Sequence, residues 1–235
     1  MRYLFSKLLM VTLIASLSAC SSDENSTAQP ILSVNFNTVT SLFNTQGQTA
    51  SVSKQASGGN FVFDDGFITL TAMEYEAESE NDLESVEFEL EQVVVIDFAT
   101  GIPSPDIRAI EIPAGIYEEV SVELEILDET DEPSVVLTGT YTSPGGTSTP
   151  IRFEFNSGET FEVEREGTIV FAENESAVAQ ITFDPSAWFA GVTDNHMADA
   201  TQYDGVIVIS ESQNSEIFDL VADGLDLATE LEIEN

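Results

Sequence analysis

In the segment VSVELEI, residues 120–126, valine, leucine and isoleucine alternate with serine and glutamate. The same period of two recurs in residues 86–91, 151–155 and 161–163. Such a period buries one face of a β-strand and leaves the other in water, which is typical of antiparallel sheets. Turn-forming clusters of Gly, Pro, Asn and Asp separate these runs, and no strand–helix repeat is present. The sequence therefore predicts an all-β protein, an antiparallel β-sandwich of the Ig-like or transthyretin-like type.

The C-terminal region has a different period. Asn214 or Ser215 can cap a helix, because both side chains accept hydrogen bonds from backbone amides. Apolar side chains then follow at helical spacing, at Ile217, Val221, Leu225 and Ala228. We expect a short C-terminal helix at about residues 215–229 on or beside the sheet, although Gly224 lowers its helix propensity.

The first nineteen residues have the features of a secretory signal peptide. Arg2 and Lys7 give a basic start, and residues 8–17 form a mostly apolar run that is too short to span a bilayer. The run ends in Leu17-Ser18-Ala19-Cys20, which resembles the lipobox of bacterial lipoproteins. In that family the signal peptide is cut before the cysteine, whose sulfur carries a diacylglycerol. The resemblance implies that residues 1–19 are removed and that Cys20 is acylated with chains such as palmitate.

The lipobox also accounts for the cysteine content. Cys20 is the only cysteine, so no intrachain disulfide can form. Residues 20–30 are predicted to be the lipidated cysteine and a polar, flexible tether. We expect residues 31–235 to form one β-sandwich domain, in which the proline-containing stretch 101–106 is a loop.

The charge of the chain is strongly one-sided. It has 43 acidic and 6 basic residues, and its formal net charge is -37. This balance excludes nucleic acid as a partner, since phosphate binding needs clustered Lys and Arg. It also argues against electrostatic docking on anionic lipid, which leaves the lipid anchor as the predicted contact with the membrane. Because 42% of the residues are hydrophobic and 15 are Phe, the chain has enough apolar material for a core.

The acidic residues follow the strand pattern. Residues 74–91 contain nine acids and no base, and the acids at 74, 76, 78, 80, 82 and 84 are spaced by two. In an extended chain they share one face. Together with the glutamates of residues 87–91, 123–125 and 162–164, they are predicted to cover the solvent faces of several strands.

Three interpretations of this acidity stay open. The first is a solvated surface suited to a salty environment, because salt screens the repulsion. The second is recognition of a basic partner. The third is calcium binding by oxygen-rich loops, although none has the EF-hand spacing. The calcium candidates are Asp194, Asn195, Asp199 and Asp204.

The sequence favours a non-enzymatic protein. His196 is the only histidine, and no Gly-x-Ser-x-Gly, phosphate-loop, dinucleotide or His-Glu-x-x-His motif is present. The sequence indicates no required cofactor, and calcium is the one ion whose binding we consider. The alternative function is a carboxylate-based hydrolase of envelope or extracellular polysaccharide, since two carboxylates suffice for that chemistry. Trp188 and Phe189 could contact carbohydrate, but a core position is the favoured interpretation.

A second resemblance concerns the body of the chain. It rests on the segments IPAGIY (112–117), LTGTY (137–141), ITFD (181–184) followed by Trp188-Phe189, and DGVIVIS (204–210). Their order resembles lipoproteins of gram-negative envelopes that carry a β-sandwich domain of unknown function. The resemblance covers residues 65–230 and supplies no catalytic residues. It implies the β-sandwich fold and a location at the cell envelope, which we expect to be the outer membrane, on its periplasmic face or at the cell surface. Our leading hypothesis for the function is a lipid-anchored, non-enzymatic binding or scaffolding module with a protein or glycan partner.

Overall fold

The structure is a computed structural model that describes residues 28–40, 43–44, 59–79, 85–128, 130–156, 160–225 and 229–234. The predicted signal peptide, Cys20 and most of the tether lie outside the described residues. No helix within the described ranges is long and apolar enough to cross a membrane.

The strands form two sheets, neither of them closed. The first has the order β14-β11-β1-β6, with bounds β1 Ile31–Thr38, β6 Ile110–Glu111, β11 Ser176–Phe183 and β14 Thr229–Glu234. The second has the order β10-β7-β3-β8-β9-β13-β12, and β2, β4 and β5 also belong to it. Its bounds are β2 Phe43–Asn44, β3 Asn60–Ser79, β4 Val86–Asp97, β5 Pro103–Ser104, β7 Gly115–Ile126, β8 Val135–Thr142, β9 Ser148–Phe155, β10 Thr160–Phe171, β12 Gln202–Tyr203 and β13 Val206–Ile209.

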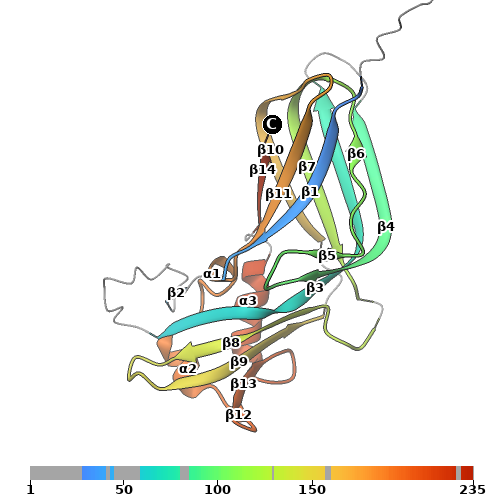
Figure 1. The fold of residues 1–235 in the computed structure, drawn as a ribbon. Coiled ribbons are helices and arrows are strands. Elements are labelled where there is room, and N and C mark those ends of the chain that lie inside the picture. The colour runs from blue at the N-terminus through green and yellow to red at the C-terminus, as the bar shows by residue number, and fades with distance from the viewer. Residues whose placement is uncertain are drawn as a thin grey trace, which may run out of the picture.

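The long strand β3 joins two halves of the molecule (Figure 1). Its first half pairs with β8, and its second half pairs with β7 on the same edge and with β4 on the other. Buried Ser134 holds the junction between β7 and β8. Its carbonyl accepts from the Thr69 amide at 2.7 Å, and its amide donates to the Phe155 carbonyl at 2.9 Å. One sheet therefore runs without interruption through both halves.

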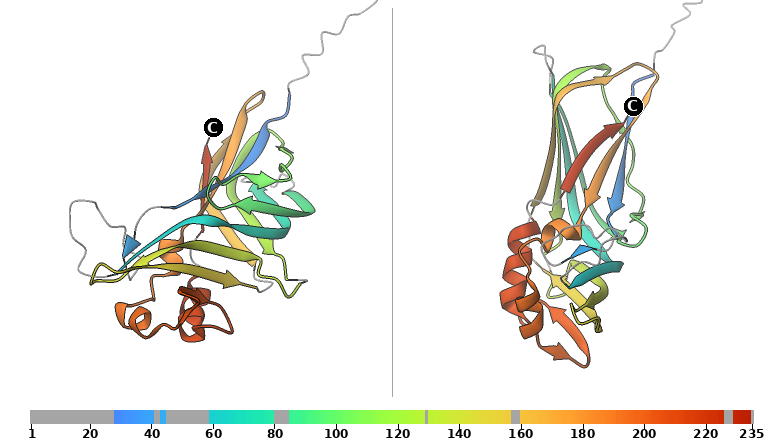
Figure 2. Two further views of the ribbon diagram at one scale, coloured as in Figure 1. Left: turned by 60° about the horizontal axis from the view of Figure 1, so that its bottom comes forward. Right: turned by 90° about the vertical axis from the view of Figure 1, so that its left-hand side faces the viewer.

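In the sandwich half, the first sheet packs over the β10-β7-β3-β4 part of the second, and Figure 2 shows the two layers side by side. The inner residues of the strands are buried, or half-buried in the first part of β4, as the period of two requires. The Phe161 and Phe183 rings meet across the layers with centroids 6.3 Å apart. The inward-facing apolar side chains of the two sheets together form the core of this half.

The other half carries three helices: α1 Pro185–Trp188, α2 Asp194–Asp199 and α3 Ser215–Leu225 (Figure 1). Trp188 and Phe189 are fully buried, and Phe189 lies within 5.0 to 5.8 Å of the Phe61, Phe63 and Phe153 ring centroids. The interpretation of these two residues as core is confirmed.

The all-β architecture with two sheets is confirmed, and the predicted short C-terminal helix is present as α3, Ser215–Leu225. The expectation of antiparallel pairing throughout was wrong, because β1 pairs with β11 and β9 with β13 in parallel. The sequence analysis also missed β14, Thr229–Glu234, which lies on the edge of the first sheet. Leu231 and Ile233 of this strand are buried and alternate with exposed glutamates, which is the period of a β-strand.

Candidate functional site

The outer surface of the second sheet, in the sandwich half, is covered by glutamates. We define the acidic face as twelve residues on four adjacent strands: Glu87, Glu89 and Glu91 of β4; Glu74, Glu76 and Glu78 of β3; Glu119, Glu123 and Glu125 of β7; and Glu162, Glu164 and Glu166 of β10. Ten are exposed, and Glu74 and Glu119 are half-buried. The neighbours of these residues along each strand point inward and are mostly buried.

The register aligns these glutamates into rows across the strands. In the central row, Glu89 is paired with Glu74, Glu74 with Glu123, and Glu123 with Glu162. A second row of three runs from Glu78 through Glu119 to Glu166. Because adjacent strands lie about 4.8 Å apart, each row places successive carboxylates close together.

The rows affect the acidity of their central members. The pKa of Glu123 is raised, first by partial desolvation and then by the negative charges of Glu162 and Glu74. Desolvation also raises the pKa of Glu119, followed by the charges of Glu78 and Glu164. Like-charge repulsion across strands is therefore a property of the folded sheet, and a bound cation would relieve it.

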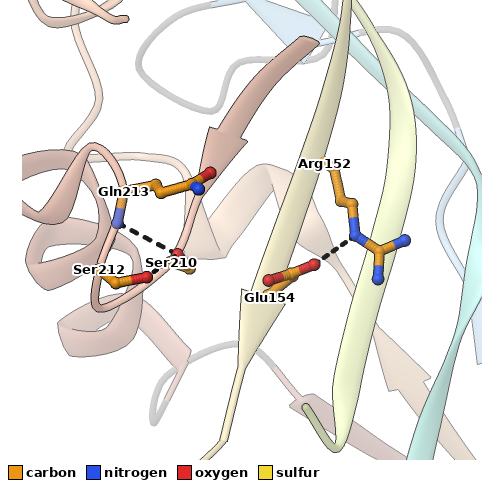
Figure 3. A network of polar contacts seen from close by, with 5 residues as sticks. All are labelled: Arg152, Glu154, Ser210, Ser212 and Gln213. Atoms are coloured by element: carbon orange, nitrogen blue, oxygen red, sulfur yellow. Dashed lines mark hydrogen bonds and ion pairs between the residues drawn. The ribbon is translucent and has the colours of Figure 1, made fainter. Parts of the chain in front are cut away.

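The arginines of the described residues all point away from the acidic face. The Arg108 guanidinium lies 5.6 Å from the centre of the Phe88 ring, on the inner side of β4. Arg165 has the inward parity of β10, and its Nη1 donates to the Ile233 carbonyl of β14 at 3.2 Å. Arg152 is on β9 in the other half, where it pairs with Glu154 (Figure 3). That contact is the only ion pair among the described residues. Within the described part of the chain, therefore, no glutamate of the acidic face is paired with a basic side chain.

A hollow interrupts the acidic face at one end. The β3–β7 register shifts beside Glu118, and the β10–β7 register shifts at Gly167 and Thr168. Between these two bulges lies a cavity of about 510 Å³. The cavity is lined by Glu78, Tyr117, Glu118, Glu119, Glu166, Gly167 and Thr168.

The predicted calcium residues lie elsewhere, in the half that carries the helices. Asp194 and Asn195 begin α2, Asp199 ends it, and Asp204 is in the turn between β12 and β13. The Asp194 carboxylate accepts a hydrogen bond of 2.8 Å from the Gly59 amide. Across the described ranges, no three His, Cys, Asp or Glu side chains come together so that they could hold a metal ion. Calcium binding by these residues stays a prediction.

His196 has a structural role at the start of α2. Its Nδ1 accepts a hydrogen bond from the Thr193 amide at 3.2 Å, and its own amide donates to the Thr193 hydroxyl at 3.3 Å. These reciprocal contacts cap the helix. An adjacent cavity of about 330 Å³ is lined by His196 together with Asp199, Tyr203 and Glu216, among other residues. Nδ1, the imidazole nitrogen that would serve as a base, already accepts a hydrogen bond from the Thr193 backbone amide.

Sequence periodicity predicted most of the acidic face but not all of it. The glutamates of β3 and β4 at 74–78 and 87–91, and those at 123, 125, 162 and 164, were expected on solvent faces, and the structure places them there. Positions 80, 82 and 84 lie outside the described residues. Glu119 and Glu166 were missed, although continuing the alternation one step beyond Ser121 and Glu164 would have found them.

Searches of protein-family models, of curated proteins and of solved structures find no match to this chain.

Proposed function

We propose that this protein is a non-enzymatic binding or scaffolding module of the cell envelope that engages a cationic partner through its acidic face. The observation that carries the proposal is the central row, in which four glutamates on adjacent strands face solvent with no arginine of the described residues beside them. A partner with several positive charges would remove the cross-strand repulsion, which amounts to roughly 0.2–1 kcal/mol for each pair.

The spacing of the carboxylates favours a polyvalent partner over a chelated ion. Successive glutamates along β3, β4 and β10 are two residues apart, about 6.8 Å, and neighbours within a row are about 4.8 Å apart. A calcium ion needs six to eight oxygen ligands at about 2.3–2.6 Å, which converge on one point. The acidic face instead spreads its charge over four strands, as suits a basic protein surface or a polyamine. Electrostatic complementarity of this kind gives fast association and strong salt dependence.

The anchor and the location are parts of the same proposal. The sequence Leu17-Ser18-Ala19-Cys20 supports lipidation of Cys20 after removal of residues 1–19. Two or three acyl chains on that cysteine would hold the protein firmly at the membrane. Incorporation of a labelled fatty acid, with Cys20→Ala as the control, tests this part, and label retained by the variant would refute it. We also propose that the sandwich half is of the Ig-like or transthyretin-like type, which the antiparallel order β10-β7-β3-β4 supports.

A pull-down from solubilised envelope tests the binding function. The variant E74Q/E123Q/E162Q neutralises three members of the central row, and E230Q/E232Q/E234Q removes three exposed carboxylates from β14 as a matched control. We expect the wild type and the β14 variant to retain the same basic protein, in calcium and in chelator alike. Equal retention by the central-row variant would contradict the proposal.

The cavity between the two bulges favours one alternative, a carboxylate-based hydrolase of envelope or extracellular polysaccharide. Glu119 has a raised pKa, as a general acid needs, and Glu78 and Glu166 flank it in register. The variant E119Q should then abolish the release of reducing sugar from envelope polysaccharide. Absence of any such release by the wild type would exclude the alternative.

A further inference from the structure

We propose that the outer edge of β4 binds an extended, basic segment of a partner protein as an additional strand of the second sheet. On one side, β4 is paired with β3 between Val86 and Asp97. On its other side it is paired with β5 only at Val95 and Ile96. From Val86 to Val94, therefore, no strand of the described residues lies on this side, which is the margin of the second sheet (Figure 1).

The chain beyond β5 leaves this edge and joins the first sheet. Asp106 and Ile107 line a cavity with β1 residues, among them Asn35. The next strand, β6, is paired with β1. Between them, Arg108 reaches back to the inner side of β4, where its guanidinium lies 5.6 Å from the centre of the Phe88 ring. This segment therefore lies against the inner face of β4 and the first sheet, and not in the plane of the second sheet beside β4.

Backbone groups of three consecutive outward residues face the open edge. The Asp97 amide donates to the Ile102 carbonyl on the β5 side at 3.0 Å. Because the N–H and C=O groups of a strand alternate between its two edges, those of Glu87, Glu89 and Glu91 face the same side as Asp97. No hydrogen bond from another described segment reaches them. A row of unpaired backbone groups on an extended strand is what an added strand binds.

The inner side chains along this edge are incompletely covered. Val94 and Ile96, next to β5, are buried. Val86, Phe88 and Leu90, along the open part of the edge, pack against the core but are only half-buried. A strand added at this edge would cover them with its own inward side chains, so the edge offers apolar contact as well as backbone groups.

Charge determines which segment fits. An added strand would lie beside Glu87, Glu89 and Glu91 on its outward side and beside Arg108 on its inward side. Basic residues therefore belong outward and apolar residues inward, which requires Lys or Arg to alternate with apolar residues. A second copy of this chain is disfavoured, because pairing of two β4 edges would place glutamates beside glutamates.

The opposite margin of the acidic face is not open in this way. β10 also carries outward glutamates, but the Nη1 of Arg165 donates to the Ile233 carbonyl, so β14 of the first sheet lies beside β10. Open backbone groups and negative charge therefore coincide at β4. The inference rests on the proposed function, because it names the partner segment that the acidic face would bind.

Hydrogen exchange of the unliganded full chain tests whether the edge is open. The amides of Glu87, Glu89 and Glu91 should have protection factors at least about tenfold lower than those of Phe88 and Leu90, which face β3. Equal protection of the two sets would overturn the inference, because it would show that the edge is already paired.

Peptide binding tests the occupant. The probe is an acetylated, amidated heptapeptide that alternates lysine with valine, and its control has the same composition with the valines in one block. The alternating peptide should bind saturably, at least about fivefold more tightly than the control, and should protect the amides of Glu87, Glu89 and Glu91. N-methyl groups on the amides of one parity, either lysine or valine, should weaken it by about tenfold, whereas those of the other parity should not.

Two triple variants test the position of the peptide. E87Q/E89Q/E91Q removes three charges next to the added strand. E162Q/E164Q/E166Q removes three from β10, which is four strand spacings away, about 19 Å. Since the screening length at physiological salt is about 8 Å, the first variant should weaken the alternating peptide by at least about fivefold and the second by less than about twofold.

A proline at the edge tests the backbone contact itself. E89P and E89Q remove the same charge, but E89P also removes an amide that faces the open edge and not β3. E89P should therefore bind the alternating peptide at least about tenfold more weakly than E89Q. Thermal melting shows whether E89P keeps the fold, and the N-methylated peptides test the same contact without altering the protein.

Failure of this inference and failure of the proposed function give different results. Equal effects of N-methylation at both parities, equal weakening by the two triple variants, or binding that leaves the three glutamate amides unprotected would overturn strand addition alone. The acidic face would then still bind cations. Absence of binding by both lysine peptides and by decalysine at millimolar concentration would overturn both.

Discussion

Glu74 of β3 and Glu123 of β7 lie directly opposite each other, with a further glutamate on the far side of each. No arginine of the described residues reaches this row. The folded sheet therefore carries an electrostatic strain that a partner can release, and the following predictions concern that strain and the packing beneath it.

Neutralising the centre of the row should stabilise the protein. Glu123 has a glutamate opposite it on both neighbouring strands, so E123Q should raise the free energy of unfolding by about 0.4–2 kcal/mol, twice the value for one like-charged pair. The matched control is E232Q, because Glu232 is exposed and lies opposite Gln180. Denaturant unfolding at low salt measures both, and the gain should shrink in about 1 M salt, where the screening length is about 3 Å. An equal gain in both variants would indicate an effect of net charge alone.

The raised pKa values of Glu119 and Glu123 predict a pH dependence of stability. A carboxyl that is protonated more easily in the folded state stabilises the fold fully below its unfolded pKa and loses that contribution as the pH rises through its folded value. E119Q/E123Q should therefore melt at a higher temperature than the wild type at pH 7, and the difference should vanish below pH 4.5, the ordinary value of these groups. A difference that grows on acidification would contradict this account.

Beneath the acidic face, Tyr75 has an unsatisfied hydroxyl. The side chain is fully buried, burial raises its pKa, and the hydroxyl finds no hydrogen-bond partner among the described residues. Tyr75→Phe removes this group without changing the ring, so it should leave stability unchanged or raise it by about 1–3 kcal/mol. Tyr117→Phe is the comparison, because that hydroxyl donates to the Pro113 carbonyl at 2.8 Å and its loss should destabilise. Chemical denaturation ranks the two variants, and a loss of stability in Tyr75→Phe would show that its hydroxyl is bonded.

Gly224 shows packing prevailing over helix propensity. In an exposed helix, Gly→Ala gains about 1 kcal/mol. In α3, however, a Cβ at this position would meet the Trp188 carbonyl at 2.6 Å. G224A should therefore destabilise by about 1–3 kcal/mol, the usual effect of overpacking. G145A is the control, because its Cβ would have only a contact of 3.8 Å to the Ser143 hydroxyl. Thermal melting that places G224A above the wild type would refute this explanation.

The local sequence predicted which side chains of a strand face solvent, but it did not predict which strands are neighbours in the sheet. The alternation at residues 120–126 assigned Glu123 and Glu125 to solvent, because side-chain direction has a period of two. It could not place Glu123 between Glu74 and Glu162, since register depends on pairing between distant segments. The parallel partnership of β1 with β11 is of the same kind, and the junction at Ser134 depends on contacts with Thr69 and Phe155.

The most direct test of the central claim is calorimetric titration of the protein with decalysine. The account predicts saturable binding that weakens by about tenfold or more when salt is raised from low to physiological strength. E74Q/E123Q/E162Q should weaken binding by at least about fivefold, whereas E230Q/E232Q/E234Q, with the same change in net charge, should stay within about twofold of the wild type. Equal weakening by the two triple variants would contradict the account, because decalysine would then respond to the overall charge and not to the acidic face.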